Sequence, residues 1–63
     1  MIVVTRLNQN ELVVNAEQIK TVESTPDTMI TLINGERLIV RESVSEVVKR
    51  AIEYGRRVRA FAT

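Results

Sequence analysis

The chain has 63 residues, a net charge of +1, and neither cysteine nor histidine. This length allows one domain spanning residues 1–63, and the composition excludes disulfides and the usual zinc ligand sets. A core of this size supplies only about 3–5 kcal/mol of net stability, so we expect a homo-oligomer to add support. No apolar run approaches the roughly 20 residues of a membrane span, so we expect a cytoplasmic protein without membrane insertion.

Short runs of β-branched and apolar residues, separated by Asn, Gly and Pro, predict five antiparallel strands. The predicted strands span residues 2–7, 11–14, 19–24, 28–33 and 36–41. Residues 15–18 interrupt the strand pattern as a single helical turn. Because the strands come first and a helix comes last, the order of elements predicts an α+β fold. Its sheet, over residues 2–41, is a hairpin meander that is either open or barrel-like.

The strongest turn signal is the Asn34-Gly35 pair, which predicts a two-residue type I′ loop because both residues tolerate positive φ. This loop would place Ile30 opposite Ile39 and would give the hairpin two apolar faces. One face contains Met29, Ile33, Leu38 and Val40, and the other contains Ile30, Leu32 and Ile39. One helix covers only one face, so the other closes a barrel or meets another subunit. The sequence leaves open which face packs against the helix and which meets another subunit. Ile30, Leu32 and Ile39 are therefore candidates for either the core or the oligomer interface.

The last element is an amphipathic helix predicted over residues 44–60. Ser43 and Glu46 have the spacing of a capping box, in which each side chain accepts the other's free backbone N–H. Apolar residues then recur at three- and four-residue steps, as one buried helix face requires. Residues 44–63 have a formal charge of +3 and residues 1–43 a formal charge of −2, so the basic groups gather on this helix.

Basic side chains are the candidate partner-binding residues. Those on the polar side of the predicted helix are Arg50, Arg56, Arg57 and Arg59. They form either a binding surface or a solvated helix face. Arg6 lies on the first strand, where it either contacts a partner or pairs across the strands with Glu11. Because the chain has no histidine, cysteine or glycine-rich phosphate loop, we expect that the protein is not an enzyme. We also expect that it binds no cofactor, metal or small-molecule substrate.

A pattern of short motifs runs through nearly the whole chain. Its members are Thr5-Arg6-Leu7-Asn8, Asn15, Ile19, Glu23, Pro26-Asp27-Thr28, Ile30-Thr31-Leu32, Asn34-Gly35, Val40, Glu42-Ser43, Glu46-Val47 and Tyr54 with Arg56-Arg57. In this pattern, residues 1 to about 59 resemble the FlbD-type flagellar proteins, the family that includes the swarming motility protein SwrD. The resemblance implies a cytoplasmic accessory that supports swarming and flagellar motor power. It also implies contact with a motor or stator protein at the cytoplasmic face of the motor.

The chain departs from that family at one position. The family usually has Gly after the residue that corresponds to Asn8, whereas this chain has Gln9. Because Gln disfavours positive φ, we expect the first hairpin either to turn at Gln9-Asn10 or to use a longer loop.

An alternative function comes from the first six residues. Met1-Ile2-Val3-Val4-Thr5-Arg6 is similar to the start of the carbon storage regulator family, whose members are small β-rich dimers that bind messenger RNA. The near-neutral net charge argues against nucleic acid, because phosphate contacts need a basic surface. RNA-binding regulation is therefore the second hypothesis.

Overall fold

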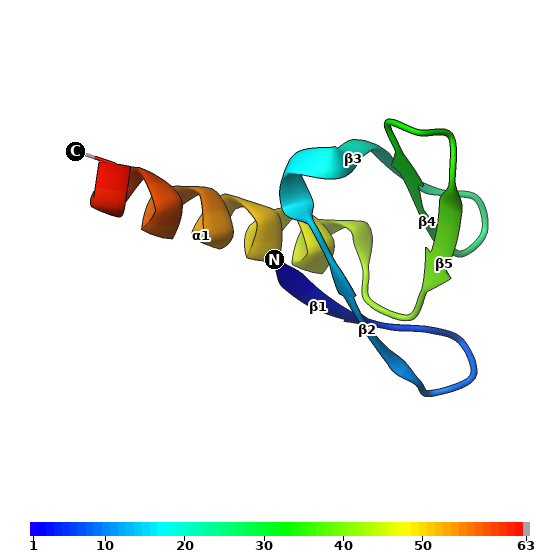
Figure 1. Cartoon of the computed structure of the whole chain (residues 1–63). Helices are drawn as coiled ribbons and strands as arrows, with labels where there is room; N and C mark the ends of the chain where they lie inside the picture. Colours follow the sequence, from blue (N-terminus) through cyan, green and yellow to red (C-terminus); the bar gives the residue numbers. More distant parts are fainter. Residues whose placement is uncertain (63) are drawn as a thin grey trace.

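The computed structural model describes the backbone of residues 1–62 and the side chains of residues 1–58. In the described part, five antiparallel strands precede one C-terminal helix, which confirms the α+β prediction (Figure 1). The strands are β1 (Ile2–Thr5), β2 (Glu11–Val14), β3 (Ile19–Ser24), β4 (Thr28–Leu32) and β5 (Arg37–Val40). A 3-10 turn, η1 (Ala16–Gln18), precedes β3, and helix α1 spans Val44–Ala62.

The strands form two sheets, with β1 paired to β2 and with β3, β4 and β5 paired in that order. The two sheets meet where β1 ends beside the end of β5. There Arg6 bridges to Val40, and the Arg41 N–H donates to the Thr5 carbonyl oxygen at 2.8 Å. Within the described strands this contact joins the sheets at one edge without closing a barrel.

The β4–β5 loop has three residues, so the prediction of a two-residue loop is wrong. The Leu32 N–H donates to the Glu36 carbonyl oxygen at 2.8 Å, which leaves Ile33, Asn34 and Gly35 in the loop. A type I′ turn needs two residues at positive φ, whereas here Gly35 has φ +92° and Asn34 does not. The Asn34 side chain instead accepts from the Glu36 N–H at 3.0 Å and stabilises the turn.

The longer loop shifts the predicted pairing by one residue and changes which side chains share a face. Ile30 pairs with Leu38, and Met29 pairs with Ile39. The face that packs on the core contains Thr28, Ile30, Leu32, Leu38 and Val40. The predicted membership of the two faces, with Ile30 and Ile39 on the same one, is therefore wrong, because Ile39 shares the outer face with Met29.

The β1–β2 hairpin has the same design. Its three-residue loop is Leu7-Asn8-Gln9, closed by the Arg6 N–H donating to the Asn10 carbonyl oxygen at 2.8 Å. The Asn8 side chain accepts from the Asn10 N–H at 3.1 Å, and Gln9 takes the positive φ of 76° where the second loop has glycine. Of the two expected solutions for Gln9, the longer loop is the correct one.

The core lies between the two sheets and the first half of α1. Its buried hydrophobic residues are Ile2, Val4, Val14, Ile30, Val40 and Val47. The Ser43 hydroxyl accepts the Glu46 N–H at 3.1 Å and so caps the helix as predicted. Beyond the core, α1 extends away from the sheets (Figure 1), and the molecule measures 39 Å along its longest axis against 22 and 18 Å across it.

Candidate functional site

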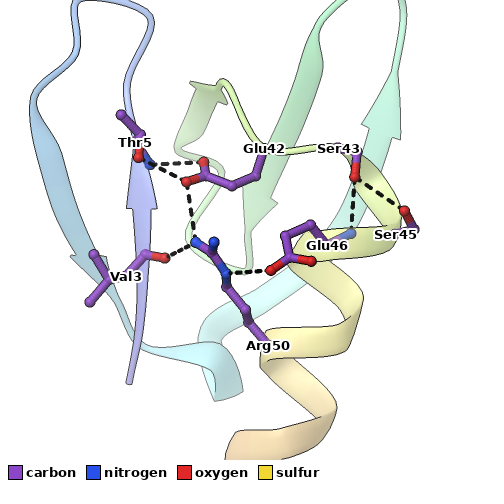
Figure 2. Close-up of polar contacts among 7 residues, drawn as sticks. All are labelled: Val3, Thr5, Glu42, Ser43, Ser45, Glu46 and Arg50. Carbon is purple, nitrogen blue, oxygen red and sulfur yellow. Dashed lines mark hydrogen bonds and ion pairs between the residues drawn. The ribbon is translucent and has the colours of Figure 1, made fainter.

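Arg50 is the centre of the polar cluster between β1 and α1 (Figure 2). Its Nη1 donates to the Val3 carbonyl oxygen at 2.7 Å and to Glu42 Oε2 at 3.2 Å. Its Nε donates to Glu46 Oε1 at 3.1 Å. The guanidinium therefore ties the start of α1 to β1, and it is engaged within the chain rather than presented to a partner.

Glu42 is the most enclosed charged member of this cluster, because its side chain is only 11% exposed. The Thr5 N–H donates to Oε1 and the Thr5 hydroxyl to Oε2, both at 2.8 Å. Burial raises the pKa of the Glu42 carboxyl, but hydrogen bonds from Thr5 and from its own backbone, with the charge of Arg50, outweigh it. The pKa of Glu42 therefore lies below its ordinary value of 4.5, and the carboxylate stays ionised at neutral pH.

The predicted capping box is half formed. Ser43 caps the backbone of Glu46, but the Glu46 carboxylate accepts from Arg50 one helical turn later instead of reaching back to the Ser43 N–H. A guanidinium four residues on is a charged donor, so it is a stronger partner than a neutral backbone N–H. No buried side-chain nitrogen or oxygen atom in the described residues lacks a hydrogen-bond partner, which suits a structural clamp that sets the direction of the helix.

The other predicted helix arginines are placed differently from Arg50. Arg56 and Arg57 are exposed, and neither makes an ion pair with a described residue. Both belong to the second half of α1, which extends beyond the core (Figure 1). Arg59 lies on the same helix, and its side chain falls outside the described residues. The exposed basic side chains of the described helix that make no ion pair with a described residue are therefore Lys49, Arg56 and Arg57, and the two arginines lie in its second half.

Arg6 lies apart from this charge. Thr5, not Arg6, is opposite Glu11, so the predicted pairing of Arg6 with Glu11 is wrong. The exposed Arg6 side chain lines a groove of about 250 Å³ between β2 and the β4–β5 hairpin. Leu32 lines the same groove as Arg6. Arg57 lines a separate hollow beside the N-terminus, so Arg6 and the helix arginines do not form one surface.

The three candidate interface residues on the β4–β5 hairpin also separate. Ile30 is fully buried in the core, Leu32 is half-buried against it, and Ile39 is exposed on the other face of the hairpin. The observed register thus removes the reason for grouping them as one interface. Oligomerisation itself stays a prediction.

Sequence reasoning did not identify the Thr5–Glu42 contact, which joins residues 37 positions apart. No periodicity or spacing relates such distant positions. The available signal was their place in the motif pattern, which includes the Thr5-Arg6-Leu7-Asn8 and Glu42-Ser43 segments.

Other site chemistry is limited in the described residues. They contain no group of three or more acidic, histidine or cysteine side chains arranged to hold a metal ion. No helix in this part of the chain combines the length and the apolar character that a membrane span needs.

Comparison with known proteins agrees with the motif pattern. Residues 1–59 match the FlbD family, described as flagellar and swarming motility proteins. This match covers the strands, the clamp and most of α1, whereas the similarity to the carbon storage regulators is limited to Met1–Arg6. No curated protein and no solved structure matches the chain. The chain belongs to the FlbD family, and its role lies in flagellar and swarming motility.

Proposed function

We propose that the protein supports flagellar motor power as a non-enzymatic binding protein at the cytoplasmic face of the motor. The free basic face of α1 contacts an acidic surface of a motor or stator protein. The observation behind this proposal is that Arg56 and Arg57 are exposed, unpaired among the described residues, and carried on the half of α1 that extends beyond the core.

The positive charge of this surface would raise the rate at which it associates with an acidic partner. Oppositely charged surfaces steer association, and the rate of such association falls as salt screens the charges. Single exposed ion pairs contribute only about 0–1 kcal/mol, so one arginine substitution has a small effect. The proposed contact surface leaves out Arg50, because its guanidinium already donates to Val3, Glu42 and Glu46 within the chain.

The test is complementation of a deletion strain with the double variant Arg56→Glu/Arg57→Glu. We expect it to lose swarming and motor torque while its circular dichroism and unfolding midpoint match those of the wild type. In a pull-down from cells, the wild type should retain a motor or stator protein that the variant does not.

The matched control is Lys20→Glu/Arg37→Glu, which changes the net charge by the same amount at two exposed positions on the sheets. This control should restore motility fully. Full restoration by the α1 double variant would show that the basic face is only solvated surface. Loss of motility in both variants would indicate an effect of net charge rather than of this face.

A further inference from the structure

An apolar groove runs along α1 on the side that faces η1 and β3. It consists of two adjoining hollows of about 330 and 270 Å³, which share Ala16 and Ala51 in their walls. We call it the helix groove. The residues that line it include Ile19, Val22, Val48, Ile52, Tyr54 and Val58. Exposed apolar side chains that lie together, rather than singly, are a candidate interaction site on a small soluble domain.

The helix side of this groove is open to solvent. Ile52 is 48% exposed, and Val48 and Val58 are exposed to a similar degree. These side chains are too apolar to be favoured in water, and the described part of the chain leaves them uncovered. The inner side of α1, by contrast, is already occupied by Val47 in the core and by the Arg50 clamp.

The charges around the helix groove are self-complementary. Lys49 and Arg56 lie three residues before and four residues after Ile52, so they flank it on the helix surface, with the exposed Glu53 between them. On the opposite wall, the exposed acid Glu17 lines the same hollow as Tyr54 and Val58. A surface with basic side chains on one wall and an acid on the other fits a second copy of itself when the two are related by a two-fold axis.

We propose that the helix groove binds α1 of a second copy of this chain, with the two helices antiparallel in a symmetrical homodimer. Ala51 and Ile52 lie at the middle of the groove and therefore beside the two-fold axis, where the small Ala51 side chain allows close approach. Each overhanging helix end covers the partner's groove, and the basic side chains of each helix face the acid on the partner's opposite wall. The dimer supplies the support that a 63-residue chain without cysteine cannot take from disulfides.

The first experiment measures the mass of the full chain by light scattering at micromolar concentration. We expect twice the 7.2 kDa of one chain. Ile52→Glu should give a folded monomer, with a dissociation constant raised at least 100-fold. The matched control is Ile39→Glu, because Ile39 is 42% exposed and lies on the sheet away from the groove. A monomeric wild type, or dissociation by Ile39→Glu with an intact Ile52→Glu dimer, would overturn the proposal.

A second experiment uses the absence of cysteine from the chain and does not depend on Ile52→Glu folding. Ile52→Cys introduces a single thiol near the axis, so mild oxidation should give a disulfide-linked dimer. Val58→Cys is the control: six residues from the axis on each antiparallel helix separate the two thiols by about 18 Å. A disulfide through Val58→Cys, or none through Ile52→Cys, would contradict the antiparallel arrangement.

Discussion

Replacing the Glu42 carboxylate tests whether the clamp between β1 and α1 stabilises the fold. In Glu42→Gln, the amide oxygen still accepts the Thr5 N–H. The amide nitrogen, however, is a donor, so it cannot accept the hydrogen bond from Arg50 Nη1. Hydrogen bonds to a charged group contribute about 1.5–3 kcal/mol, so the loss of one such bond predicts destabilisation by about 2 kcal/mol. A domain of this length has a total unfolding free energy of only about 3–9 kcal/mol.

Urea unfolding followed by circular dichroism measures this loss at one fixed chain concentration. With a slope of about 1 kcal/mol per molar urea, the midpoint should fall by about 2 M. The matched control is Glu46→Gln, which also removes a carboxylate partner of Arg50. Because the Glu46 side chain is 41% exposed and has one partner, the cost should stay within about 0.5 kcal/mol. Equal effects of the two substitutions would refute the assignment of Glu42 as the enclosed centre of the clamp.

The same pair of proteins predicts a pH dependence. The folded state lowers the pKa of Glu42 below 4.5, so its contribution to stability is present above that pH. It is lost as the pH falls through the lowered pKa, because the folded carboxylate must then take up a proton. The stability difference between wild type and Glu42→Gln should therefore be largest near neutral pH and should close in acid. A difference that persists unchanged in strong acid would contradict this reasoning.

Three further predictions concern the loops and the alternative function. Gln9→Gly should raise the unfolding free energy by about 0.5–1 kcal/mol, because glycine adopts the observed positive φ without strain; an unchanged urea midpoint would argue against strain at Gln9. Gly35→Ala should lower it by about 1 kcal/mol through the backbone alone, because an added Cβ meets no atom within 4 Å; a neutral result would contradict the turn assignment. Filter binding should show no RNA retained at low salt, whereas retention that weakens steeply with salt would revive the RNA-binding hypothesis.

The elements of this fold were predictable because their determinants are local. The apolar alternation lies within each strand, and the Ser43 cap lies at the start of the helix. The strands and the helix therefore fall within a few residues of their predicted bounds. The β4–β5 register was not predictable from the turn alone, since Asn34-Gly35 suits both a two-residue and a three-residue loop. The apolar pattern favours the observed loop, because it gathers Ile30 and Leu38 on one buried face. The arrangement of apolar residues on the two faces therefore predicts the observed pairing, whereas the Asn34-Gly35 pair alone does not.

The roles of the helix arginines could not be separated by periodicity. Arg50 and Arg57 both fall on the polar side of the helix, but only the fold shows that Arg50 reaches Val3, 47 positions away. A contact between segments so distant depends on how β1 and the end of β5 meet. Residues that differ in role can therefore look equivalent in a helical pattern when one of them lies at the junction between helix and sheet.

The clamp also determines what α1 offers to other molecules. Arg50 holds the first half of the helix against β1, and this fixes the direction in which the second half leaves the core. Loss of Glu42 would then disturb both the basic face and the helix groove, although neither surface contains that residue. Variants at Arg56 or Arg57 should leave the urea midpoint unchanged, since these side chains are exposed. Ile52→Glu should lower it, because the support of the dimer is lost. A motility defect with an altered urea midpoint would therefore point to the clamp or the dimer, and a defect with an unaltered midpoint would point to the basic face.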